Sequence, residues 1–129
     1  MTVNDLRLTV WQFVRLMVQV DETLAAKPDP GAQAVKDMWD DIWLDIDARL
    51  EELGRKDPDG FATMMMDQEV VLTGMTPSLQ SAIGSEVAKV VRAMQGTRRS
   101  TKDQQSKDDL TFEIQELNDV LSDLGQKRQ

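Results

Sequence analysis

Hydrophobic residues return every three or four positions through most of this chain, which is the spacing of amphipathic helices. The pattern is most regular between residues 32 and 53. The apolar set there is Val35, Met38, Trp39, Ile42, Trp43, Ile46, Leu50 and Leu53. Carboxylates fill most of the opposite side, at Asp37, Asp40, Asp41, Asp45, Asp47, Glu51 and Glu52. This segment is therefore predicted to be a helix with a buried aromatic stripe and an acidic outer face.

An earlier segment has the same periodicity and predicts a helix from Asn4 to Lys27, capped by Thr2 or Asn4. Its main apolar face consists of Leu6, Val10, Phe13, Met17, Val20 and Leu24. Two prolines in the following stretch, residues 27–31, cannot lie inside a continuing helix. Because this break is short, the two helices are expected to form an antiparallel hairpin.

The next segments are marked by turn residues. Gly54 is expected to end the second helix in a left-handed conformation. Residues 61–72 are predicted to be helical, with an extended conformation of residues 70–73 as the alternative. Thr76 followed by Pro77 indicates the start of a further helix, which is expected to end near Gly96.

Polar and basic residues dominate the stretch 97–107, which is interpreted as a linker or as an exposed start of the last helix. Ser106 and Asp109 resemble a capping box for that helix. Its apolar residues, spaced 4, 3, 4 and 3, form a short heptad seam made of Leu110, Ile114, Leu117, Leu121 and Leu124. This seam is one candidate for self-association and the broad apolar surface of the helix at 4–27 is the other, so a homo-oligomer is expected.

The predicted fold is all-α, with four to five helices around one core and a helical hairpin at the start. A chain of 129 residues is of a size for one such core. We divide it into a helical core at 1–96, a polar basic linker at 97–107, and a C-terminal amphipathic helix and tail at 108–129. No fixed-period repeat is present.

The amino-acid composition excludes several kinds of catalytic and metal-binding site. The chain contains no His, Cys or Tyr, which excludes disulfides, thiolate metal sites, and Ser–His or Cys–His catalytic pairs. A net charge of −8 disfavours unaided binding to nucleic acid or to an anionic membrane. The N-terminus lacks the order of a signal peptide, and no apolar run approaches the roughly 20 residues that span a bilayer. A soluble cytoplasmic protein without a cofactor is expected.

Leu44 is the one hydrophobic residue on the acidic side of the helix at 32–53. Dense like charges at helical spacing are unfavourable, which suggests a basic protein partner as their counterpart. The candidate partner-binding residues are Asp37, Asp40, Asp41, Leu44, Asp47 and Glu51. The alternative interpretation of this face is a solvated surface that keeps the protein in solution.

Carboxylates could also bind a divalent cation. Asp37, Asp41 and Asp45 are spaced four apart and could lie along one side of a helix. Further on, the sequence from Glu116 to Asp119 resembles the second acidic motif of the all-α nucleotide pyrophosphatases, the MazG-like and dimeric dUTPase group. That resemblance implies a Mg²⁺-dependent enzyme acting on nucleoside triphosphates. The family's upstream ExxE motif is matched only by residues 86–89, where Lys89 replaces the second acid.

A third possibility is nucleic-acid association through the basic residues Arg98, Arg99, Lys102 and Lys107. No aromatic residue lies among them, although single-strand binding sites usually combine the two types. The favoured function is a non-enzymatic interaction, adaptor or assembly protein, such as a phage-type accessory factor or an inhibitor. The metal-dependent enzyme and the nucleic-acid-associated assembly factor are the alternatives.

Overall fold

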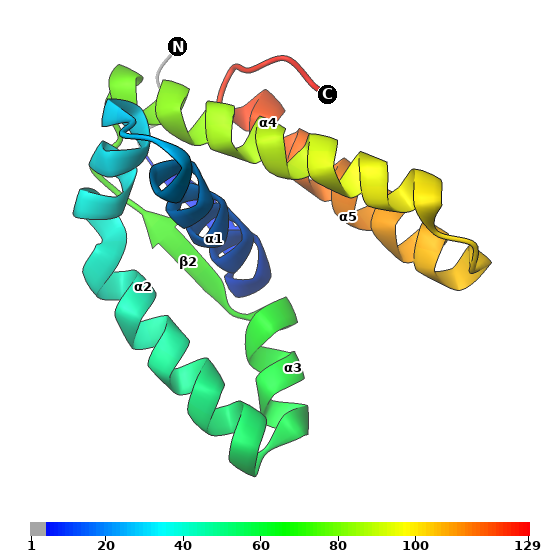
Figure 1. Ribbon diagram of the computed structural model, residues 1–129. Coiled ribbons are helices and arrows are strands. Elements are labelled where there is room, and N and C mark those ends of the chain that lie inside the picture. Colours follow the sequence, from blue (N-terminus) through cyan, green and yellow to red (C-terminus); the bar gives the residue numbers. More distant parts are fainter. Residues whose placement is uncertain (1–4) are drawn as a thin grey trace.

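The computed structural model describes residues 5–129 and confirms an all-α fold (Figure 1). Within that range five helices surround one core, and a small two-stranded antiparallel sheet joins them. The elements are β1 (Leu6–Thr9), α1 (Val10–Ala26), α2 (Pro30–Lys56), α3 (Pro58–Asp67), β2 (Glu69–Leu72), α4 (Pro77–Ser100) and α5 (Gln104–Asp123). No helix in this range is both long enough and apolar enough to cross a membrane.

The expected hairpin of α1 and α2 is present, with Pro28 in its turn and Pro30 at the first position of α2. Pro30 begins α2, where the amide hydrogen that proline lacks would have no helical partner. The two helices are joined by a stacked pair of rings, since the centroids of Phe13 and Trp43 lie 6.3 Å apart at an interplanar angle of 19°. Lys36 of α2 and Asp21 of α1 add an ion pair of 3.1 Å.

The predicted start of the first helix at Asn4 is wrong for the residues that the structure describes. Residues 6–9 form β1, and α1 begins only at Val10. Leu6 and Leu8 are buried, while Arg7 between them is exposed, so this stretch has the two-residue period of a strand. Thr9 caps α1 in a reciprocal capping box with Gln12. The earlier predicted caps, Thr2 and Asn4, lie outside the described residues.

The single helix predicted for residues 61–72 is also wrong, because the segment divides into α3 and β2. Asp57 caps α3 by accepting a hydrogen bond from the Gly60 amide at 3.1 Å. Residues 69–72 then pair with β1, with Leu6 opposite Leu72 and Leu8 opposite Val70. The extended alternative therefore holds for residues 70–72.

Two predicted helix ends lie too early, and one predicted helix start lies too late. α2 continues through Gly54 to Lys56, and α4 continues through Gly96 to Ser100. α5 begins at Gln104 with Asp103 as its cap, not at the box proposed for Ser106. Only residues 101–103 of the proposed linker are outside helices.

The continuation of α4 has a local cause. Thr97 and Ser100 donate hydrogen bonds from their hydroxyl groups to the carbonyls of Ala93 and Gly96, one turn earlier, at 3.2 and 3.0 Å. These bonds occupy side chains that would otherwise compete for the backbone. The polar composition that suggested a linker is thus the exposed side of two helix ends.

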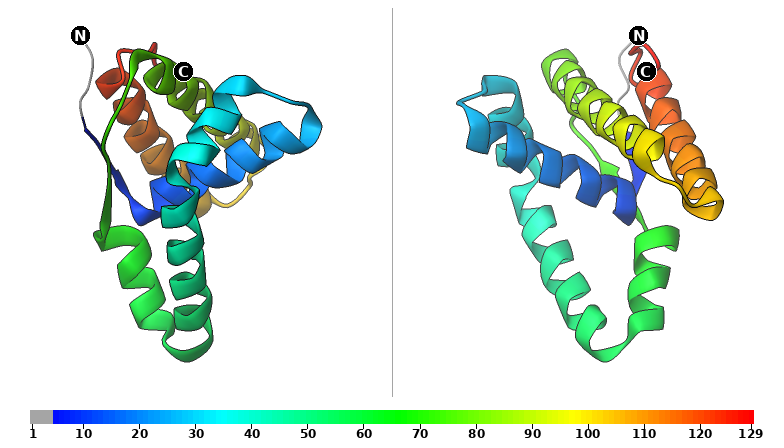
Figure 2. Two further views of the ribbon diagram at one scale, coloured as in Figure 1. Left: turned by 90° about the vertical axis from the view of Figure 1, so that its left-hand side faces the viewer. Right: turned by 45° about the vertical axis from the view of Figure 1, so that its right-hand side comes forward.

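Two pairs of helices, α2 with α3 and α4 with α5, extend from α1 in different directions (Figures 1 and 2). α4 and α5 lie side by side, and α3 lies beside the C-terminal part of α2. α1 contacts α2, α3 and α4, and its buried side is central to the core. The connection between α4 and α5 lies at the far end of its hairpin from β2 (Figure 1).

Candidate protein-interaction surface

The acidic candidate residues all lie on α2, whose start is fixed by its cap. The Asp29 carboxylate accepts a hydrogen bond of 3.0 Å from the Ala32 amide. This bond satisfies one of the free amides of the first turn, and the negative charge suits the positive end of the helix dipole. Ala32 and Val35 of this first part are buried.

α2 is not one regular helix, because Trp39 has non-helical backbone angles of φ −124° and ψ 15°. The predicted apolar stripe is consequently only partly buried. Trp39, Ile46 and Leu50 belong to the core, whereas Met38 is 48% exposed and Ile42 is 38% exposed. A change of helix phase at Trp39 removes the single continuous face that regular spacing predicts.

We define the Leu44 surface as Asp37, Asp40, Asp41, Leu44, Asp47 and Glu51. Four of its carboxylates stand three, four or seven positions from Leu44 on the regular part of α2, so they border the leucine on one side of the helix; these are Asp40, Asp41, Asp47 and Glu51. Asp37 lies on the far side of the irregularity at Trp39. Leu44 itself is 58% exposed. Asp40 is half-buried, and the other members of the set are exposed. Five of the six predicted residues, from Asp40 to Glu51, thus share one side of the regular part of α2, and their role in binding stays a prediction.

The carboxylates of the Leu44 surface differ in their local partners. Asp37 accepts a hydrogen bond of 2.8 Å from Gln33, and Glu51 lies 3.7 Å from Arg55. Within residues 5–129, the side chains of Asp40, Asp41 and Asp47 make no hydrogen bond or ion pair. Three negative charges around an exposed leucine therefore have no counterpart in the described part of the chain.

The other side of α2 contributes to a groove of about 590 Å³ between α2 and α3. Leu53 lines this groove and follows Leu44 by nine positions, which is half a turn around a helix. The lining cations Arg49 and Lys56 already pair with acids of the same helix, at 3.4 and 3.2 Å. This groove therefore offers less unpaired charge than the Leu44 surface.

The heptad seam of α5, predicted to mediate self-association, is covered within the chain. Four of its residues, Ile114, Leu117, Leu121 and Leu124, are buried, and Leu110 is half-buried. α4 is the helix that packs most extensively against α5. In this conformation the seam packs within its own chain, and its role in self-association stays a prediction.

The residues proposed for metal binding are not gathered into one site. Across residues 5–129, no group of three or more acidic side chains lies close enough to hold an ion. Asp119 of the pyrophosphatase-like motif forms a 2.9 Å ion pair with Arg128. In the incomplete ExxE motif at residues 86–89, Lys89 stands in place of the second acid and forms a 3.1 Å ion pair with Glu86.

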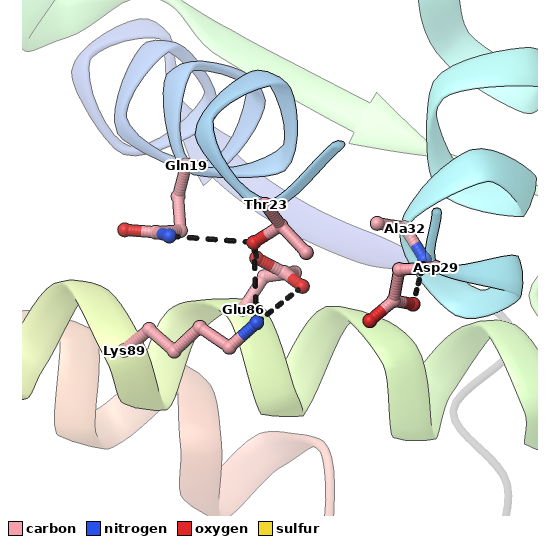
Figure 3. Close-up of polar contacts among 6 residues, drawn as sticks. All are labelled: Gln19, Thr23, Asp29, Ala32, Glu86 and Lys89. Carbon is pink, nitrogen blue, oxygen red and sulfur yellow. Dashed lines mark hydrogen bonds and ion pairs between the residues drawn. The ribbon is translucent and has the colours of Figure 1, made fainter. Parts of the chain in front are cut away.

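Glu86 belongs to a buried polar cluster that the sequence analysis missed (Figure 3). Its carboxylate accepts a 2.7 Å hydrogen bond from the Thr23 hydroxyl of α1 and a 3.1 Å bond from the Lys89 ammonium. Lys89 also donates to the Thr23 hydroxyl at 3.1 Å, and Gln19 does so at 3.4 Å. The cluster joins α1 to α4 and satisfies the buried acid.

The sequence contained a signal for this cluster. Glu86 lies three positions after Ile83 and four before Val90, so it falls on the apolar side of its helix. Thr23 similarly continues the buried side of α1, three positions after Val20. A charged residue in such a position is expected to have a partner on the neighbouring helix.

A second buried-side acid, Glu113 of α5, lies near Arg15 of α1. Burial raises the pKa of the Glu113 carboxyl above its ordinary value; Arg15 opposes this shift, and Asp109 and Glu116 add to it. The Arg15 guanidinium also lies over the Trp11 ring, 5.3 Å from its centroid. Burial in the fold thus disfavours the charged form of the Glu113 carboxyl.

Sequence reasoning also missed Phe112, which is 58% exposed on α5. It lies outside the heptad seam and is bordered at helical spacing by Asp108, Asp109 and Glu116. Its environment therefore resembles that of Leu44. The signal was the same in both cases: one large apolar residue among acids on a helix exterior.

Comparisons of this chain with protein-family models, with curated proteins and with solved structures found no match.

Proposed function

We propose that this protein is a non-enzymatic interaction or adaptor protein that binds a basic partner protein through the Leu44 surface. The observation that carries the proposal is an apolar side chain, 58% exposed, surrounded by carboxylates of which three have no partner within residues 5–129. A solvated acidic face would need no leucine at its centre.

The two kinds of side chain would have different tasks in such a complex. Unpaired carboxylates attract a basic surface over several ångströms and raise the rate of encounter. Leu44 then gives a contact that excludes water, and burying a leucine side chain stabilises by roughly 1.5–3 kcal/mol. A partner helix or loop carrying Lys or Arg around an apolar residue would match this surface.

The proposal is tested with two variants of the purified protein, Leu44→Asp and the pair Asp41→Lys with Asp47→Lys. Immobilised wild-type and variant proteins are compared for the host proteins they retain, identified by mass spectrometry. Proteins retained by the wild type and lost with both variants are then purified and titrated calorimetrically. Direct binding that weakens about tenfold in each variant supports the proposal.

A matched control carries Asp108→Lys and Asp109→Lys, two exposed acids on α5, and has the same net charge as the α2 pair variant. The control is expected to bind like the wild type. If the control and the α2 variant lose the same partners, overall charge is responsible and the proposed surface is wrong. Binding unaffected by Leu44→Asp would also contradict the proposal.

A further inference from the structure

We infer that the partner of the Leu44 surface can be a second copy of this chain, which docks through its connection between α4 and α5. We call Arg98, Arg99, Lys102 and Lys107 the basic turn. The inference rests on the proposed function, because it uses the same acceptor surface and names one occupant for it. The result would be self-association, as a reciprocal dimer or as a longer assembly.

The basic turn carries an excess of positive charge. Residues 98–107 contain its four cations and one acid, Asp103, which gives a net charge of 4 − 1 = +3. In the described part of the chain none of the four cations makes an ion pair. Arg98 donates a hydrogen bond of 2.7 Å to the Thr111 hydroxyl, which leaves its positive charge uncompensated.

The Leu44 surface and the helix that carries it have an excess of negative charge. Residues 28–60, which contain α2, hold ten acids and four cations, a net charge of 4 − 10 = −6. On the Leu44 surface, Asp40, Asp41 and Asp47 form no ion pair within residues 5–129. Each surface thus lacks the kind of charge that the other presents.

The two surfaces cannot neutralise each other inside one chain. Figure 1 shows α2 on one side of the molecule and the α4–α5 connection, yellow to orange, at the far end of the other hairpin. The connection also protrudes, with Arg98, Arg99 and Lys102 exposed, so it can reach a helix face on another molecule. Contact between these two surfaces therefore requires a second copy of the chain.

A second copy fits the basic turn better than nucleic acid does. The turn contains no aromatic residue on which a base could stack, and Asp103 lies within it while Asp108 and Asp109 follow directly. The whole chain carries −8, so a polyanion would be repelled by the rest of the protein. A second copy instead presents the acidic Leu44 surface.

Because the two contacting surfaces are different, a pair of copies can form either one contact or two. Two reciprocal contacts close a symmetric dimer, whereas single contacts extend into rings or open chains. Self-association through them should grow with protein concentration. It should also weaken at high salt, since screening acts strongly on exposed charges.

The test uses full-length protein and two charge variants. The turn variant carries Arg99→Glu and Lys102→Glu, and the surface variant carries Asp41→Lys and Asp47→Lys. Their net charges are −8 − 4 = −12 and −8 + 4 = −4. Sedimentation velocity at about 20 mM salt measures the average mass over a range of concentrations, and about 500 mM salt provides the screened reference.

We expect the wild type to associate at low salt and each variant alone to remain monomeric. The surface variant is closer to neutrality than the wild type, so general repulsion cannot explain its loss of association. An equimolar mixture should associate again, because the unchanged basic turn of the surface variant can dock on the unchanged Leu44 surface of the turn variant. Circular dichroism confirms folding, and Arg99→Gln with Lys102→Gln lowers the net charge of residues 98–107 to 3 − 2 = +1 for comparison, which should weaken association about tenfold.

A wild type that stays monomeric at low salt, or a mixture that does not associate, would overturn the inference. A turn variant that keeps self-association but loses binding to a DNA duplex would assign the basic turn to nucleic acid. None of these results contradicts the proposed function if the Leu44 variants still lose binding to a host protein. If the variants lose self-association and no host protein binds the wild type, the inference is supported, and the partner of the Leu44 surface is a second copy of the chain.

Discussion

Glu86 shows how a single buried charge can define a helix contact. Its side chain is 3% exposed, and it is held by Thr23 of α1 and by Lys89 of its own helix. A buried ion is costly unless its partners replace the lost hydration. The cluster therefore selects the one arrangement of α1 on α4 in which the Glu86 oxygens have donors from both helices.

Replacing Lys89 by Met is expected to lower the free energy of unfolding by about 2–3 kcal/mol, because it leaves the buried carboxylate without its cation. The double variant Lys89→Met with Glu86→Gln should recover most of that loss. Urea unfolding at neutral pH measures both values. The control is Lys36→Met, which breaks the more exposed pair with Asp21 and should cost about 1 kcal/mol or less. Equal losses for the two single variants would argue against a special role of the buried pair.

The raised pKa of Glu113 makes a second residue-scale prediction. The folded protein holds the Glu113 proton more tightly than the unfolded chain, so its favourable contribution is present below the ordinary pKa of 4.5. That contribution is lost as the pH rises through the higher folded pKa. Glu113→Gln keeps the site neutral, and it should raise the melting temperature relative to wild type more at pH 7 than at pH 4. Thermal unfolding at both pH values checks this, and an equal shift at both would contradict it.

At the scale of elements, α5 is the clearest case of a pattern with two possible partners. A heptad seam is equally suited to a helix of the same chain and to a helix of another copy. The structure places α4 on it and buries Ile114, Leu117, Leu121 and Leu124. Spacing along the sequence reports that a face is covered, and it carries no information about which helix covers it.

Leu117→Ala should therefore lower the free energy of unfolding by about 3 kcal/mol, as expected for a fully buried leucine. The midpoint of urea unfolding should not depend on protein concentration when measured in about 500 mM salt, where charge-driven association is screened. Leu44→Ala is the matched control, because this leucine is 58% exposed and its loss should change stability by about 0.5 kcal/mol or less. A midpoint that rises with protein concentration would show that the seam is shared between copies.

The errors in element boundaries have physical causes. Leu6 and Leu8 fit the helical face of their neighbours as well as the two-residue period of a strand, and only pairing with residues 70–72 decides between them. That partner is distant in sequence, so local spacing could not reveal it. Gly54 and Gly96 are tolerated inside helices because glycine there costs only about 1 kcal/mol relative to alanine.

At the scale of the whole molecule, the sequence predicted the helix count, the single core and the first hairpin. These depend on apolar spacing and on strong breaks such as Pro28 and Pro30, which act locally. The six residues of the Leu44 surface were chosen from helical spacing alone, and their role in binding stays a prediction. The distribution of unpaired charge was not predictable, because it depends on how far the α4–α5 connection lies from α2 (Figure 1).

The pairing of β1 with β2 also bears on the order in which the chain can fold. These strands join Leu6 to Leu72 and enclose α1, α2 and α3 between them, so closing this long loop has a considerable entropic cost. Helices form within about a microsecond, whereas contacts between distant segments come later. Until the strands meet, Leu6, Leu8 and Leu72 lack their buried environment. A refolding chain would thus pass through a helical state with two apolar strand segments still open to aggregation.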